Sequence, residues 1–231
     1  MTGSVIHVFI AAVLFIGAHF ALSSQPLRQV LSMRLGERPF LAIYTLVALA
    51  SFAWLLLAYA RAPYVTLWPP SVWTRWIPLC VMPFAMILLV SGYLVRNPTV
   101  VGQEHLLATT DPAPGILKIT RHPAMWAMAL WGLSHIPANG DAASLVLFVA
   151  IIVLALGGAA HIDRRRRTAY PKEWQRFATV TSYVPFVAIA GGRTQLTLRD
   201  IGWAGPLLGF ILFAVFMFTH KWLIGVPAWP L

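Results

Sequence analysis

The sequence predicts an all-α protein, a polytopic bundle of about six membrane-spanning helices. Hydrophobic residues make up 59% of the 231 residues and charged residues only 10%, with a mean hydropathy of +0.74, whereas soluble domains are about a quarter charged. Apolar stretches of about 20 residues, the length needed to cross a bilayer, recur along the chain. Positive charges gather in alternate loops between them. We therefore expect a single transmembrane domain over residues 1–231.

The chain reads in order as apolar spans separated by polar or aromatic loops. The expected spans are residues 4–22, 40–59, 76–95, 119–137, 142–162 and 203–222. No Lys or Arg precedes the first span and no clear small-x-small cleavage site follows it, so we expect an uncleaved helix rather than a signal peptide. Residues 23–39 are expected to form a polar basic loop, and the Pro- and Trp-rich residues 61–75 a loop at the membrane–water interface. Asn139-Gly140 predicts a tight turn.

The segment between the fifth and sixth spans is expected to remain at the membrane surface. It begins with Asp163 and the four arginines at 164–167, which are typical of a topology anchor or a lipid-headgroup contact. An amphipathic stretch follows at residues 170–181, and then a short apolar piece at residues 183–190. That piece is too short to span, so it is expected to be re-entrant or interfacial.

The distribution of positive charge predicts the orientation. The first, third and fifth loops hold 14 of the 17 Lys and Arg residues, and the other side holds only Arg61, Arg75 and Lys221. By the positive-inside rule, the first set faces the cytoplasm. We expect a multi-pass protein of the bacterial inner membrane with both termini in the periplasm. Because topology accounts for the net charge of +10, we expect the lipid bilayer as a partner and no nucleic acid.

Several reaction classes are excluded or disfavoured by residue content. The single cysteine, Cys80, excludes an intrachain disulfide, a Cys-x-x-Cys site and covalent c-type haem attachment; we expect it to be a small buried residue of a span. None of the expected spans contains a carboxylate, which disfavours a proton-coupled transporter. No nucleophile–base motif or nucleotide-binding glycine loop is present. Gly157-Gly158 predicts close helix packing.

The histidines mark the candidate site, because ionisable side chains inside a bilayer are rare and usually functional. The topology places His19, His122 and His161 in a layer near the cytoplasmic side, and His7 and His135 in a layer near the outer side. His122 and His135 are 13 residues apart, about 20 Å along one helix, so that helix alone cannot supply both ligands of one metal. Two helices that each give one histidine could clamp a haem iron. The simpler alternative is hydrogen bonding between helices.

Two further features flank the fourth span. Arg121-His122-Pro123 begins it, and the free N–H groups of a helix start, with Arg121 and Lys118, suit an anion or a carboxylate; the simpler interpretation is proline at a first helical turn. Met128, Trp131 and His135 form a stripe that would wall a haem ring or only pack. Asp163 would orient His161 or pair with the neighbouring arginines.

Eight segments together resemble one known family over nearly the whole chain. They are Gly17-Ala18-His19-Phe20, Leu35-Gly36-Glu37-Arg38, residues 115–123 (GILKITRHP), residues 130–135 (LWGLSH), Asn139-Gly140-Asp141, Asp163-Arg164-Arg165, residues 181–186 (TSYVPF) and Gly192-Arg193. The family that they resemble is the NnrU family of membrane proteins.

The resemblance implies a function and a cofactor. The family is named for a bacterial protein linked to nitrite and nitric oxide reduction, which implies a role in denitrification and respiratory nitrogen-oxide reductases, nitric oxide or an apolar small molecule as partners. A relative, the plastid ζ-carotene isomerase, is a haem b enzyme that isomerises a polyene. Its haem histidines fall on His19 and His135, and its alternative cysteine ligand falls on Gly132. A Cys/His ligand exchange at the iron is therefore not expected here.

The residues leave several alternatives open. Depth pairs His19 with His122 or His161, whereas the resemblance pairs it with His135, so His122 remains an alternate ligand. A more distant resemblance connects Arg121-His122-Pro123 with isoprenylcysteine and phospholipid methyltransferases, but their acidic pair is reduced here to Asp163, which puts methyl transfer in doubt. The expected functions are thus a haem b protein of nitrogen-oxide metabolism, a polyene cis/trans isomerase, or a non-catalytic assembly factor. The substrate and any catalytic residue are not specified by the sequence.

Overall fold

The computed structural model describes residues 3–109 and 113–229, and within them the fold is all-α with no β-strand. Six long helices form the bundle: α1 (Val5–Ser23), α3 (Glu37–Ala60), α4 (Val72–Leu94), α5 (Pro123–Asn139), α6 (Ala142–Ala169) and α10 (Ala204–Ile224). Shorter helices are α2 (Gln25–Leu35), η1 (Glu104–Ala108), η2 (Gly115–Lys118), α7 (Pro171–Val180), α8 (Val187–Ala190) and α9 (Leu198–Ile201). The predicted fold class is confirmed.

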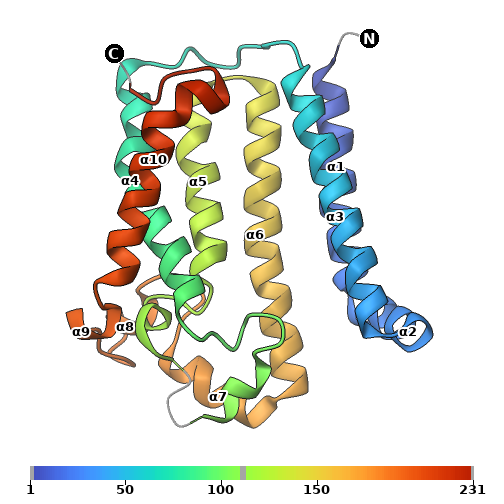
Figure 1. Ribbon diagram of the computed structural model, residues 1–231, viewed down its shortest axis with the longest axis vertical. Coiled ribbons are helices and arrows are strands. Elements are labelled where there is room, and N and C mark those ends of the chain that lie inside the picture. The colour runs from blue at the N-terminus through green and yellow to red at the C-terminus, as the bar shows by residue number, and fades with distance from the viewer. Residues whose placement is uncertain (1–2, 110–112, 230–231) are drawn as a thin grey trace.

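The long helices have the dimensions of membrane spans. Among the described residues, five are long and apolar enough to cross a bilayer, namely α1, α3, α4, α6 and α10. The sixth, α5, has 17 residues, a length of about 26 Å, and lies between α4 and α6 (Figure 1). Both chain ends lie at the same end of the bundle (Figure 1), as expected for an even number of crossings.

The bundle has two parts that α6 joins. On one side α5 packs against α4, and α10 packs against α4; on the other side α1 packs against α3 (Figure 1). Helix α6 packs on both α5 and α1. Helix α3 makes its main contact with α1 and only a light contact with α6. Helices α1 and α3 therefore form one wall of the bundle, and α1 attaches this wall to α6.

Three predictions about the elements need correction. Residues 23–39, expected as a loop, contain α2, which has proline in its first turn and ends at Gly36, where φ is +86°. Helix α6 continues past residue 162 to Ala169, because arginines end an apolar span without ending a helix. Cys80 is exposed rather than buried. By contrast, the apolar piece at residues 183–190 does not span, as expected: its only helix is the four-residue α8.

The predicted turn between α5 and α6 is confirmed. Gly140 ends α5 in the left-handed conformation with φ +71°, and Asp141 then caps α6, because its carboxylate accepts a hydrogen bond from the Ser144 N–H at 3.0 Å. The Gly140 carbonyl accepts hydrogen bonds from the backbone N–H groups of Leu67 and Trp68. A Cβ on Gly140 would lie 2.2 Å from the Trp68 oxygen. Glycine therefore lets the outer loop close over this turn.

Candidate functional site

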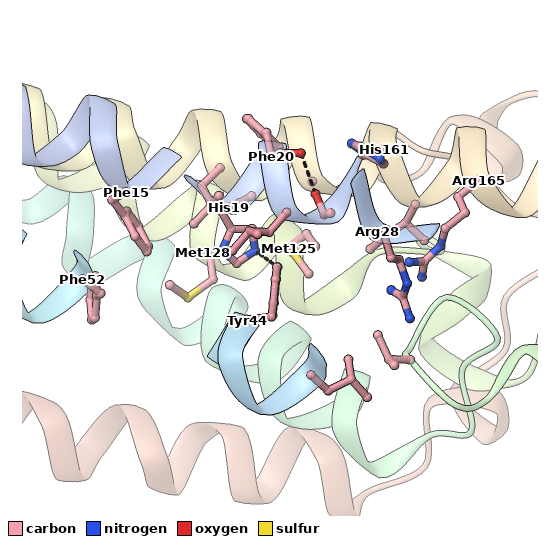
Figure 2. Close-up of a pocket in the computed structure, with 18 of the residues that line it drawn as sticks. Phe15, His19, Phe20, Arg28, Tyr44, Phe52, Met125, Met128, His161 and Arg165 are labelled. Carbon is pink, nitrogen blue, oxygen red and sulfur yellow. Dashed lines mark hydrogen bonds between the residues drawn. The ribbon is translucent and has the colours of Figure 1, made fainter. Parts of the chain in front are cut away.

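A cavity of about 460 Å³ lies between α1, α3, α5 and α6. Its size is in the range of small-molecule sites, about 300–1,000 Å³. The walls are mainly apolar, with Phe15, Phe52, Met125 and Met128 among them, and His19 lies between these side chains (Figure 2). Because three of the helices that line it, α1, α3 and α6, are long and apolar enough to cross a membrane, this is a cavity suited to an apolar ligand.

His19 is a half-buried polar group of this cavity with an unused, buried nitrogen. One ring nitrogen, Nε2, lies 2.5 Å from the hydroxyl of Tyr44, whereas Nδ1 is buried and has no hydrogen-bond partner among the described residues. A buried polar atom without a partner is costly and calls for an explanation. An imidazole nitrogen in an apolar cavity has the chemistry of a metal ligand.

His135 has a free nitrogen at a different level of the bundle. Its Nδ1 lies 2.8 Å from the Trp131 carbonyl oxygen, and because a carbonyl only accepts, Nδ1 carries the proton. The other nitrogen, Nε2, is then the basic one, the arrangement in which a histidine binds a metal. The ring packs 5.4 Å from that of Phe148. His135 lies two helical turns, or about 10 Å, beyond Met128 on the same face of α5, and it does not line the cavity.

The structure therefore brings together one predicted pair of histidines and not another. His19 and His161 line the same cavity, as their expected common depth suggested. His19 and His135, the pair implied by resemblance, stand at different levels, and their joint ligation of one iron stays a prediction. His122, from the same expected layer as His19, lies outside the cavity in a separate polar cluster.

That polar cluster consists of Arg121, His122 and Asp163. The guanidinium of Arg121 donates to Oδ2 of Asp163 from Nε at 2.9 Å and from Nη2 at 2.5 Å, and His122 Nε2 lies 2.6 Å from Oδ1. Only 8% of Arg121, 2% of His122 and 7% of Asp163 is exposed. Arg121 also lies over the Trp174 ring, 5.5 Å from its centroid. The cluster locks the start of α5 to the far end of α6 and to α7.

This arrangement changes the interpretation of the helix start. The sequence suited Arg121 and Lys118 to an anion or a carboxylate, and each binds a carboxylate of its own chain: Arg121 binds Asp163, and Lys118 donates to Asp200 at 2.7 Å. Asp163 pairs with Arg121 and His122 rather than with the arginines that follow it.

The groups outside the spanning helices have shifted proton affinities. Burial lowers the pKa of His122, which precedes the first residue of α5, and Asp163 opposes this without reversing it. A neutral His122 donates its Nε2 proton to the carboxylate. Burial raises the pKa of Tyr183, and the charge of Asp163 raises it further. The Tyr183 hydroxyl donates to the Leu156 carbonyl at 2.5 Å, so both groups act here as neutral hydrogen-bond donors.

The family model described as "NnrU protein" matches residues 8–228. The 15-cis-zeta-carotene isomerase, chloroplastic, of Zea mays is 37% identical over 82 residues, which are 36% of this chain and 22% of that protein. The protein of the same name from Arabidopsis thaliana is 35% identical over 82 residues, with the same coverage. The matched stretch thus spans about a fifth of the length of these relatives. No solved structure matches.

Proposed function

Because this chain belongs to the NnrU family, we propose that it is a membrane protein that binds haem b in the cavity between α1, α3, α5 and α6 and acts on an apolar polyene in the manner of an isomerase. Two relatives are named as isomerases of a carotene, an apolar polyene. They match over a short part of their length, so the activity is part of the proposal.

The observation that carries the proposal is the unpartnered ring nitrogen of His19 in an apolar cavity. His19 would hold the haem iron through this nitrogen, and His135, with its basic Nε2, has the chemistry of a second iron-binding residue although it stands at another level. The alternate, His122, has its Nε2 taken by Asp163. When bound, haem b supplies a redox-active iron.

The other residues of the cavity would serve the ligand without reacting. The Tyr44 hydroxyl holds the imidazole of His19 in place at 2.5 Å, as an outer partner does for a metal-binding histidine. Met125 and Met128 give flexible, polarisable walls. Phe15 and Phe52 pack with their ring centroids 5.3 Å apart and exclude water from one end.

The absorption spectrum of the purified protein tests haem binding. We expect a Soret band and the pyridine haemochrome of haem b, a band strongly reduced in His19→Ala, and a shifted band in His135→Ala because loss of a residue that would hold the iron alters its spectrum. His105→Ala is the matched control, since His105 is exposed in η1 and its loss should leave the spectrum unchanged. A protein without a Soret band, or a band that survives the His19→Ala/His135→Ala double substitution, would refute the proposal.

The polyene reaction is tested by co-expression with a pathway that accumulates cis-ζ-carotene. We expect the cis/trans ratio of the extracted carotene to shift with the wild-type protein and not with His19→Ala. An unchanged isomer ratio in the presence of haem-loaded protein would exclude this substrate and leave haem binding standing.

A second candidate function is favoured by Gly132. A Cβ at this position would lie 2.8 Å from Cγ1 of Ile152 and 3.0 Å from the Phe148 oxygen, so the site has no room for the cysteine that the resemblance places there. A haem site without that sulfur need not carry out a Cys/His ligand exchange, so we also propose the role that the family resemblance implies, in nitrogen-oxide metabolism at the bacterial inner membrane with nitric oxide as a ligand. The test is nitrite- and nitric-oxide-reductase activity in membranes of a strain that lacks the protein; normal activity would remove this candidate and the assembly-factor role together.

A further inference from the structure

The cavity is apolar at one end and basic at the other. Phe15 and Phe52 lie at the apolar end, His19 lies between, and the guanidinium groups of Arg28 and Arg165 lie at the far end (Figure 2). An apolar hydrocarbon alone would not require this second end, because guanidinium groups stay charged and are stabilised by anions or water.

Only one of these two arginines has its charge balanced within the described residues. Arg28 forms an ion pair with Glu37 and lies over the Phe40 ring at 5.6 Å. Arg165 has neither a hydrogen bond nor an ion pair there. The charge of Glu104 reaches Arg165, but the Glu104 carboxylate is bound by Arg166 at 2.6 Å, and the charges of Arg28 and Arg166 also act on Arg165.

The position of Arg165 in its run of arginines is distinctive. Arg164 and Arg167 are exposed, and Arg166 is buried on Glu104 and on the Val100 carbonyl. Arg165 is the member of the run that lines the cavity. Sequence position alone would treat the four as one lipid-facing patch, whereas the geometry separates them into three environments.

We propose that the occupant of the cavity is an anionic amphiphile, whose carboxylate or phosphate group is bound by Arg165 with Arg28 while its apolar body lies against Phe15, Phe52 and Met128. A guanidinium group matches a carboxylate with two parallel hydrogen bonds. The bound anion balances the charge of Arg165 and fixes which end of the ligand reaches His19. This inference rests on the proposed cavity as a binding site, and it does not depend on iron ligation.

The test uses iron-free ligands, so that it fails or succeeds separately from haem binding. Protoporphyrin IX is compared with its dimethyl ester, and a long-chain fatty acid with its methyl ester, on the detergent-solubilised full-length protein by fluorescence titration. The first pair reports a tetrapyrrole carboxylate and the second a lipid carboxylate. Each ester keeps the apolar body and removes the charge.

We expect at least one acid to bind roughly tenfold or more tightly than its ester, because charge-assisted hydrogen bonds are the strong ones. Arg165→Gln should bring that ratio close to one, and Arg28→Gln should reduce it less because Arg28 already has Glu37. Arg164→Gln and Arg167→Gln are the matched controls and should keep the wild-type ratio. The pair that discriminates identifies the source of the anion.

Three outcomes would overturn the inference. They are equal binding of acid and ester in both pairs, no binding of either acid, and a preference for the acid that survives the Arg28→Gln/Arg165→Gln double substitution. Size-exclusion profiles and thermal unfolding of each variant ensure that lost binding reflects the cavity and not the fold. Loss of haem in His19→Ala with the acid preference intact would separate this site from the iron ligand.

Discussion

Gly158 is the residue at which a substitution can fill the cavity most directly. It lines the cavity on α6, and a Cβ built there meets nothing within 4 Å. Gly158→Leu should therefore place a side chain in the ligand space with no clash at its Cβ, while leucine stabilises a helix by about 0.8 kcal/mol relative to glycine. We expect haem and protoporphyrin binding to fall at least tenfold with an unchanged or raised midpoint of thermal unfolding.

The matched control for this prediction is Gly17→Leu. Gly17 is also a mid-helix glycine with nothing within 4 Å of its Cβ, but it is exposed on α1 and does not line the cavity. Its substitution should leave ligand binding unchanged. Full binding in Gly158→Leu, measured by absorption or fluorescence titration, would show that the ligand does not use this cavity.

For single residues, the sequence predicted the position along a helix but not the side chain that each one contacts. Arg121 and His122 were correctly placed at a helix start, but their shared partner, Asp163, lies 42 and 41 residues further along the chain, respectively. Hydropathy gives the depth of a side chain and not its direction around the helix. The contact of Tyr44 with His19 was missed for the same reason, since a tyrosine near the end of a span is ordinary.

At the scale of the helices, the α5–α6 packing depends on Gly132. A Cβ there would lie 2.8 Å from Ile152 Cγ1 and 3.0 Å from the Phe148 oxygen, a backbone atom that cannot move alone. Gly132→Cys should therefore separate the two helices and destabilise the protein by about 1–3 kcal/mol, the usual cost of overpacking. Thermal unfolding in detergent measures this.

Gly158→Ala serves as the control, because it adds a Cβ to α6 where nothing lies within 4 Å of it, and it should unfold no lower than wild type. The haem spectrum of Gly132→Cys gives a second readout. We expect no thiolate signature, since the added sulfur has no room to reach the cavity; a wild-type unfolding midpoint with a thiolate-ligated spectrum would contradict this packing.

The helices themselves were predictable where hydropathy and helicity coincide. The spans at α1, α3, α4 and α10 were found to within a few residues because each is apolar throughout. The errors at α2 and at the end of α6 arise where a polar, charged sequence is still helical. A bilayer restricts charge, whereas the backbone hydrogen bonds of a helix do not, so charge marks the membrane boundary and not the end of the helix.

At the scale of the whole molecule, the charged loops and the chain ends lie at opposite ends of the bundle. Both termini share one end of the bundle, and α7 lies at the other (Figure 1). We expect the end with the termini to face the periplasm, by the positive-inside rule. In a Cys80→Ala background, Thr66→Cys should react with a membrane-impermeant maleimide on intact spheroplasts.

Thr168→Cys, in the exposed last turn of α6, is the opposite marker. It should react only after the membrane is permeabilised, and the labelled fraction is measured by gel shift. The reverse pattern would invert the orientation and place the Arg28–Arg165 end of the cavity outside the cytoplasm.

The light contact between α3 and α6 has a consequence for supply of the ligand. Helix α3, which is held mainly by α1, could part from α6 without disturbing α5, and the gap would then face acyl chains rather than solvent. A sparingly soluble molecule would then reach His19 by lateral diffusion within the leaflet. Occupancy would follow its mole fraction among the lipids, so that two membranes with equal aqueous concentrations could load this protein to different extents.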